Sequence, residues 1–168
     1  MTEKAIQVDT RQKLGKHDEK HGGLERMGYT LLRSKLAFGD YAKLPPIVVD
    51  SKADIYELAM DIDQEHERFR AELVGARDLG VRMVVLVENE DGVRDLDGLR
   101  KWREPEASFR RRRAKMRYCG SRIAAACETM RERYGVEFAF CAPEDAADFV
   151  LDILGREEHA RLVGGGGG

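Results

Sequence analysis

The chain has 168 residues, of which 36% are charged and 42% hydrophobic, and a formal net charge of −2 at pH 7, which suits one globular domain. Its three cysteines are odd in number and have no Cys-x-x-Cys spacing, which excludes a zinc finger or a disulfide scaffold and favours reduced thiols in a cytoplasmic protein. No apolar run reaches the roughly 20 residues of a bilayer span, and the N-terminus lacks the apolar core of a signal peptide, so we expect no membrane segment.

The first half of the chain is predicted to form short strands separated by turns. Residues 5–9, 29–36 and 47–51 are strand-like, and Gly39 and the pair Pro45-Pro46 are turn signals before the third of them. Residues 14–23 are polar and expected to be irregular, and a short helix over 24–27 ends before Gly28. These segments favour a sheet rich in hairpins.

The second half alternates predicted helices and strands. Apolar residues recur every three to four positions through 53–79, which predicts one long amphipathic helix capped by Gly80. An apolar strand follows at 81–87, and then come a helix at 119–134, a strand at 136–141 and a helix at 143–154. Residues 99–115 are basic and weakly patterned, and we expect them to be mobile in the free protein. The glycine run at 164–168 is expected to be a flexible tail, which leaves 1–163 as a single domain.

Three aspartates and a lysine stand at the ends of predicted strands. Asp9 ends the first strand, Asp40 follows the turn at Gly39, and Asp50 ends the strand that leads to Lys52. Because side chains alternate between the faces of a strand, Asp50 and Lys52 should point the same way. Carboxylates bind Mg²⁺, and a lysine can stabilise a phosphate or move a proton, so this pattern suits phosphodiester hydrolysis. The simpler interpretation of Asp-x-Lys is a salt bridge at a strand end.

Positive charge is concentrated in one segment. Between residues 100 and 117 the chain carries nine Lys or Arg against Glu104 and Glu106, a local balance of +7, which leaves −9 for all other residues. The run Arg110, Arg111, Arg112 and Arg113 is therefore a candidate for contacts with the phosphates of a nucleic acid. The alternative is a solvated face, because basic runs are common.

His66 has two interpretations. It falls between Ile62 and Phe69 on the apolar stripe of the predicted long helix. A histidine in that position is most often a buried core residue with a hydrogen bond. It could instead face a metal and the scissile phosphate, with Arg68 or Gln64 beside it.

The residues around the acids resemble a known family. The segments Val8-Asp9-Thr10-Arg11-Gln12, Gly39-Asp40-Tyr41 and Val49-Asp50-Ser51-Lys52 resemble the nuclease domain of XPF-type structure-specific endonucleases, a branch of the PD-(D/E)xK superfamily. That family has Asp-x-Arg-Glu, then Gly-Asp, then Glu-Arg-Lys. Segments 63–69, 84–88 and 134–141 are similar to small stand-alone nuclease domains of phages and prophages. This chain departs from the family pattern at four positions, which are Gln12, Asp50, Ser51 and Tyr56.

The resemblance implies an α/β domain of restriction-endonuclease-like fold, with a central mixed sheet flanked by helices. It implies a Mg²⁺-dependent DNA endonuclease, with Mn²⁺ as a substitute and phage or prophage DNA processing as its role. Asp40 and Asp50 are expected to bind the metal, Asp9 to be a further or water-mediated ligand, and Lys52 to orient or deprotonate the attacking water. The residues expected to contact DNA are Arg11, His66, Arg68, Arg110, Arg111, Arg112 and Arg113. XPF-type enzymes act as dimers, so a homodimer is one option. The other two hypotheses are an inactive DNA-binding module and a protein-interaction scaffold.

Overall fold

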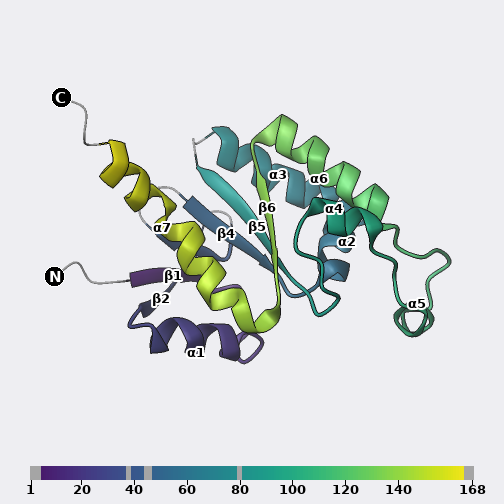
Figure 1. Ribbon diagram of the computed structural model, residues 1–168, viewed down its shortest axis with the longest axis horizontal. Coiled ribbons are helices and arrows are strands. Elements are labelled where there is room, and N and C mark those ends of the chain that lie inside the picture. The colour runs from purple at the N-terminus through teal and green to yellow at the C-terminus, as the bar shows by residue number, and fades with distance from the viewer. Residues whose placement is uncertain (1–4, 37–38, 44–46, 79–80, 165–168) are drawn as a thin grey trace.

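The computed structural model describes residues 5–36, 39–43, 47–78 and 81–164 (Figure 1). Within these residues, one mixed sheet of six strands has the order β2-β1-β3-β4-β5-β6. The strands are β1 (Ala5–Asp9), β2 (Thr30–Ser34), β3 (Tyr41–Lys43), β4 (Ile47–Lys52), β5 (Arg82–Glu88) and β6 (Glu137–Cys141). Strand β3 is antiparallel to both β1 and β4, whereas the pairs β1–β2, β4–β5 and β5–β6 are parallel. The sheet therefore has the expected mixed character.

Helices cover both faces of the sheet. On one face lie α1 (Asp18–Arg26) and α7 (Ala146–Gly164), which pack against each other, while α2 (Ile55–Asp63), α3 (His66–Asp78), α4 (Leu96–Lys101) and α6 (Gly120–Tyr134) lie on the other (Figure 1). A 3₁₀ turn, η1 (Pro143–Asp145), precedes α7. Helix α5 (Glu106–Arg112) buries no residue and projects beyond the body of the domain (Figure 1).

Strand β4 lies inside the sheet and is buried over its whole length. Ile47 and Val49 join the apolar cluster under α7, whereas Val48 joins the cluster under α2, α3 and α6. Because side chains alternate, Asp50 and Lys52 leave the strand on the side of Val48, and Ser51 leaves it on the side of Val49. The alternation thus sends the acid and the lysine to one face, as the sequence predicts.

The predicted strands are confirmed with small shifts of their ends, but two predictions about helices are wrong. The segment expected to be irregular contains most of α1. The two glycines of this helix lower its helix propensity, so the sequence did not predict it. Gly23 is there for packing, because a Cβ at this position would lie 2.8 Å from the Cβ of Ala147 in α7. The predicted long helix is two helices, since the carbonyl oxygen of Met60 accepts from both Gln64 and Glu65 and α2 ends there. The basic segment contains the end of α4 and the whole of α5.

Some expectations fall outside the described residues. Pro45, Pro46, Gly80 and the glycines 165–168 are among them, while Gly164 is the last residue of α7. Over the ranges that are described, no helix is both long enough and apolar enough to cross a membrane. The three cysteines are free, and burial raises the pKa of Cys127 and of Cys141 to about 12.

Candidate active site

Three aspartates form a row across the sheet. The register pairs Val8 with Tyr41 and Tyr41 with Val49, so the next positions along the strands bring Asp9 beside Asp40 and Asp40 beside Asp50. Backbone hydrogen bonds extend the pairing, from Asp9 N to the carbonyl oxygen of Asp40 and from Asp40 N to that of Val49, both at 2.8 Å. Side chains directly opposite one another share a face of the sheet. Strand pairing therefore brings together acids that lie 41 residues apart in the chain.

Asp40 and Asp50 are the pair of carboxylates in this row that could best bind a metal ion. A side-chain oxygen of Asp40 accepts a 2.6 Å hydrogen bond from Ser51 N. Burial, followed by repulsion from Asp50, raises the pKa of Asp40 to about 7. Burial and the neighbouring carboxylate thus disfavour the ionised form of Asp40, and a bound divalent cation would offset both effects. The pair therefore has the chemistry of a Mg²⁺ or Mn²⁺ site, in which one or two carboxylates act together with several waters.

Asp50 is paired with a cation of the protein itself. Its side chain is buried, and Lys52 Nζ lies 2.9 Å from its Oδ2 as an ion pair. No group of three His, Cys, Asp or Glu side chains within the described ranges forms a ready-made metal cage. Asp40 and Asp50 would therefore hold a cation together with water molecules, and not within an all-protein shell.

Asp9 lies in the row, but Arg11 engages it. Arg11 N donates to Asp9 Oδ1 at 3.0 Å and Arg11 Nε donates to Oδ2 at 2.6 Å, so both carboxylate oxygens are in use. The guanidinium also donates to the carbonyl oxygen of Leu36 at 3.1 Å. This arrangement suits the expected water-mediated role of Asp9 better than direct ligation.

Lys52 lies between two carboxylates. Its ammonium forms ion pairs with Asp50 and with Asp61, a buried residue of α2. Burial acts to lower the pKa of Lys52, but Asp50 and Asp61 outweigh it and the pKa is raised. Lys52 therefore enters the cleft as a cation, which suits stabilisation of charge on a phosphate better than removal of a proton from water.

The sequence arguments missed Asp61. The family places an acid four residues beyond the lysine, where this chain has Tyr56, and Asp61 lies five residues further along the helix. A signal was available, because Asp61 follows Leu58 by three residues and so falls on the buried stripe of α2. A carboxylate in that stripe needs a buried cation, and Lys52 supplies it.

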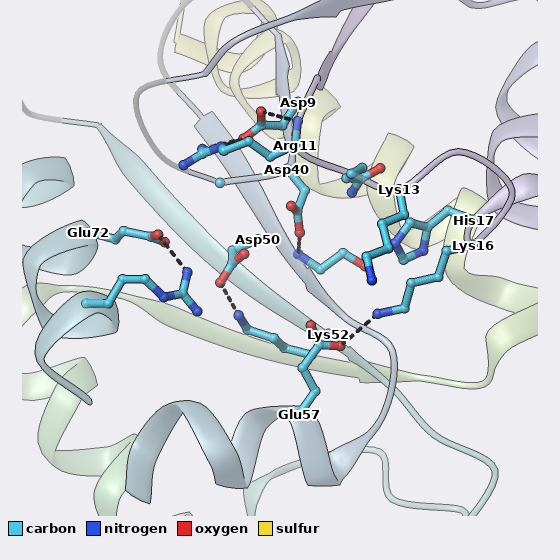
Figure 2. Close-up of a pocket in the computed structure, with 14 residues that line it drawn as sticks. Asp9, Arg11, Lys13, Lys16, His17, Asp40, Asp50, Lys52, Glu57 and Glu72 are labelled. Carbon is cyan, nitrogen blue, oxygen red and sulfur yellow. Dashed lines mark hydrogen bonds and ion pairs between the residues drawn. The ribbon is translucent and has the colours of Figure 1, made fainter. Parts of the chain in front are cut away.

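These side chains line a cleft of about 360 Å³ (Figure 2). The row of aspartates and Lys52 form its floor, and Glu57 and Glu72 of α2 and α3 lie on one side (Figure 2). Arg68 lies on that same side and contacts Asp61 and Glu72 at 3.2 and 3.3 Å. Burial, followed by the negative charge of Asp50, raises the pKa of Glu72. The opposite side consists of the loop between β1 and α1, which contributes Arg11, Lys13, Lys16 and His17.

Ser51 lines the cleft, but its side chain leaves β4 on the opposite face. Ser51 Oγ accepts a 2.6 Å hydrogen bond from Lys20 Nζ and donates to Glu88 Oε1 at 3.2 Å, and Lys20 also pairs with Glu88. All three side chains are almost fully buried on the face of α1 and α7. A long cation from α1 thus occupies the space behind β4 where the family has an arginine on the strand itself. The loss of that arginine does not remove a charge from the cleft.

His66 and the arginine run lie elsewhere. The expected place of His66 on a buried stripe is wrong, because the break between α2 and α3 changes the phase of the helix and leaves His66 exposed. It lines a shallow apolar depression between α3 and α6 and does not reach the cleft. Arg110, Arg111, Arg112 and Arg113 are on or next to α5, and none of them lines the cleft either.

Arg112 already has close partners within the protein. It makes two 2.7 Å hydrogen bonds to Glu104, whose side chain is fully buried, and its guanidinium lies 4.0 Å from the centre of the Tyr118 ring. Glu104 also accepts from Tyr118 N at 2.8 Å. Arg112 therefore fastens the base of the projecting segment, and the predicted phosphate contacts fall to Arg110, Arg111 and Arg113.

Comparisons with known proteins give fold-level similarity. Two solved structures that resemble this chain are XPF from Aeropyrum pernix, with a TM-score of 0.65 and 16% identity, and XPF from Aeropyrum pernix in complex with DNA, with a TM-score of 0.63 and 18% identity. Each match covers 94% of this chain and about two thirds of the other, 67% and 66% respectively. No family model and no curated protein sequence matches the chain. The expected α/β fold of the XPF nuclease type is thereby confirmed.

Proposed function

We propose that this protein is a metal-dependent DNA endonuclease. The observation that carries the proposal is the row of Asp9, Asp40 and Asp50 beside Lys52 on the floor of one cleft, within an XPF-like fold. A salt bridge alone explains Asp50 and Lys52 but does not explain why a second carboxylate, that of Asp40, lies beside Asp50. Such acid pairs are typical of sites that bind a hard cation and act on phosphate oxygens.

Each side chain has a part in this hypothesis. Asp40 and Asp50 would hold Mg²⁺ or Mn²⁺, which supplies an acidified water and a positive charge for the phosphoryl oxygens. Lys52 adds a cation at the same phosphate, and Asp61 keeps its ammonium in place. Asp9 orients the edge of the site through its hydrogen bonds with Arg11. Arg11 and Arg68 are the arginines near enough to bind the phosphates beside the cut, because both line the cleft.

The other expectations from the sequence do not concern the cleft, and they too are proposals. The exposed arginines of the projecting segment, Arg110, Arg111 and Arg113, offer a second place for contact with the DNA backbone. A role in phage or prophage DNA processing and a homodimer are what the sequence resemblance implies, and a cytoplasmic location is what the three cysteines favour. Binding to DNA without cleavage is the rival hypothesis, and the engagement of both Asp9 oxygens by Arg11 is the feature that favours it.

A cleavage assay separates the two hypotheses. The purified protein is incubated with labelled duplex, flap, fork and four-way-junction DNA in the presence of Mg²⁺, Mn²⁺ or EDTA. We expect cleavage with either metal and none with EDTA, because the proposed water is acidified only by a bound cation. Products with 5′-phosphate or 3′-phosphate ends would identify which bond breaks. Binding without cleavage under every metal condition would support the inactive module.

Lys52→Ala is expected to reduce the single-turnover cleavage rate by about 100-fold or more, because a positioned cation or proton donor contributes on that scale. Mn²⁺ affinity measured by calorimetry should be retained, since removing a positive charge beside Asp50 does not weaken its attraction for a cation. Lys101→Ala, at the exposed end of α4, is the control. Equal losses of metal affinity and rate in a folded Lys52→Ala protein would make Lys52 structural, and Lys52→Gln repeats the test if alanine prevents folding.

A further inference from the structure

A buried polar cluster lies behind β4, on the face of the sheet that α1 and α7 cover. It consists of Lys20, Ser51 and Glu88, whose side chains are joined by hydrogen bonds and an ion pair. Their relative exposures are 4%, 5% and 9%, so water does little to solvate the two charges. A buried ion pair adds little to stability, because the cost of taking charges out of water offsets their attraction. The cluster is therefore better explained by what it holds in place.

Lys20 reaches the residues next to both proposed metal ligands. Tyr41 follows Asp40 at the start of β3, and Ser51 follows Asp50 in β4. Lys20 Nζ donates to Ser51 Oγ at 2.6 Å, and it lies 5.5 Å from the centre of the Tyr41 ring. One side chain from α1 thus contacts β3 and β4 from the face opposite the cleft.

Ser51 carries the effect of this cluster to the cleft. Its backbone N donates a 2.6 Å hydrogen bond to the Asp40 carboxylate, while its Oγ is bound by Lys20 on the other face. Because both contacts belong to one residue, loss of the contact with Lys20 lets Ser51 move and weakens the hydrogen bond to Asp40. Metal ligands must be held to within about 0.5 Å of their working geometry, and side chains beyond the ligands usually do this.

The cation of the cluster comes from α1 and not from β4. The family pattern has an arginine at position 51, and its side chain would leave the strand on the same face as that of Ser51. In this chain the small side chain of Ser51 leaves room for Lys20, which reaches Glu88 from the helix. We therefore expect position 20 and position 51 to be interchangeable as the source of one buried positive charge.

We propose that Lys20 is a positioning residue for the metal pair, because it fixes Ser51 against Glu88 so that Ser51 N holds the carboxylate of Asp40 beside Asp50. The inference rests on the proposed function, and it adds to that function a residue that does not line the cleft. Lys20 touches neither the metal nor the DNA, and its effect passes through Ser51.

The charge is tested with Lys20→Ala/Glu88→Gln. Both charges are removed, because Glu88 left buried without a cation would by itself destabilise the fold. Mn²⁺ affinity is measured by calorimetry on the whole chain. We expect the affinity to fall about 10- to 100-fold, which is the usual effect of losing a group that orients a metal ligand.

The mechanism is tested by moving the cation to the strand. Lys20→Ala/Ser51→Arg keeps Glu88 paired, and it should recover most of the Mn²⁺ affinity that Lys20→Ala/Glu88→Gln loses. A packing role of Lys20 in α1 would not be recovered in this way, because the helix still lacks its side chain.

Two controls separate positioning from general effects on this face of the sheet. Arg26→Ala removes an exposed charge from the last turn of α1. Val150→Ala removes apolar contacts from the cluster under α7, where Val150 is fully buried. Both variants should bind Mn²⁺ as the wild type does, although Val150→Ala should unfold at a lower urea concentration.

The amide proton of Ser51 gives a readout that needs no metal. In ¹H–¹⁵N spectra recorded in EDTA, a hydrogen bond to a carboxylate moves this resonance downfield, and Asp40→Ala gives its position without the bond. We expect the Ser51 resonance of Lys20→Ala/Glu88→Gln to move upfield toward that reference. An unchanged resonance or an unchanged Mn²⁺ affinity in this folded variant would overturn the proposal, and so would a failure of Ser51→Arg to recover the affinity.

The two hypotheses can fail separately. A shifted Ser51 resonance in the Lys20 variant, when the wild type neither binds Mn²⁺ nor cleaves DNA, would support positioning of Asp40 by Lys20 and reject the nuclease. Metal-dependent cleavage by the wild type, with resonance and affinity unchanged in the Lys20 variant, would keep the nuclease and reject the role of Lys20.

Discussion

Asp50→Asn is expected to reduce DNA cleavage by roughly 1000-fold or more while the domain stays folded, because loss of a metal carboxylate removes the acidified water and the charge that offsets the transition state. The amide has the same shape but no negative charge, and Asp50 lies beside both Asp40 and Lys52. Single-turnover rates with Mg²⁺ and with Mn²⁺ measure the effect. Retention of most of the rate would remove Asp50 from the metal site.

Two further measurements make this result specific. DNA binding in EDTA should change little or strengthen slightly, since the variant has one negative charge less near the phosphates. Thermal unfolding should confirm the fold, because the buried pair of carboxylates repel one another in the wild type. Asp78→Asn, at the exposed end of α3, is a charge-matched control that should cleave normally.

Gly120→Ala is expected to destabilise the fold by about 2–4 kcal/mol, which is large for the addition of one methyl group. A Cβ at Gly120 would be driven into the carbonyl oxygen of Leu99 and would lie 2.6 Å from that of Trp102. Both are backbone atoms at the end of α4, so the clash is relieved only if α4 and α6 move apart. Leu99 is fully buried and Trp102 is nearly so, and such a movement would open the core beneath them.

Urea unfolding of Gly120→Ala and wild type gives this difference. Gly155→Ala is the matched control, because it makes the same change within α7 where a Cβ meets nothing within 4 Å. The control should stabilise the protein by up to about 1 kcal/mol through helix propensity. A Gly120→Ala protein within about 0.5 kcal/mol of wild type would contradict the close approach of α4 and α6.

The strands were predictable because their signal is local. Residues 47–51 and 81–87 are apolar runs with turn signals or polar residues around them, and the structure places β4 and β5 there. The sequence could also predict that Asp9, Asp40 and Asp50 lie along one edge of the sheet, because each acid stands next to a predicted strand or turn. Their alignment in one row depends on the register of β3. This strand has three residues, which is too short for a hydrophobic periodicity to predict it.

The helices were harder because packing decides them. Gly22 and Gly23 lower the helix propensity of α1, yet the close approach to Ala147 needs one of them. The break after Asp63 depends on a shared acceptor at Met60 and has no proline or glycine to mark it. That break alone moved His66 from an expected interior position to the surface.

The site residues that the sequence arguments missed belong to elements other than the strand that carries the motif. Asp61 and Glu72 come from α2 and α3, the helices that follow β4. Ser51 is one of the departures from the family pattern, but its side chain leaves β4 on the face opposite Asp50 and accepts a hydrogen bond from Lys20. A motif gives the residues of one strand, and the partners that complete them come from the packing of other elements.

The segment that carries α5 leaves and rejoins the domain at one place. Arg103 and Cys119 form a β-bridge at its base, and Glu104 ties Arg112 and Tyr118 together just beyond it. None of the residues of α5 is buried, so the sheet and its apolar clusters do not depend on them. Apart from Arg112, which pairs with the buried Glu104, an excursion closed off in this way can lengthen, shorten or change its sequence at little cost to stability. The domain can thus acquire new surface chemistry during evolution while the row of aspartates stays where strand pairing puts it.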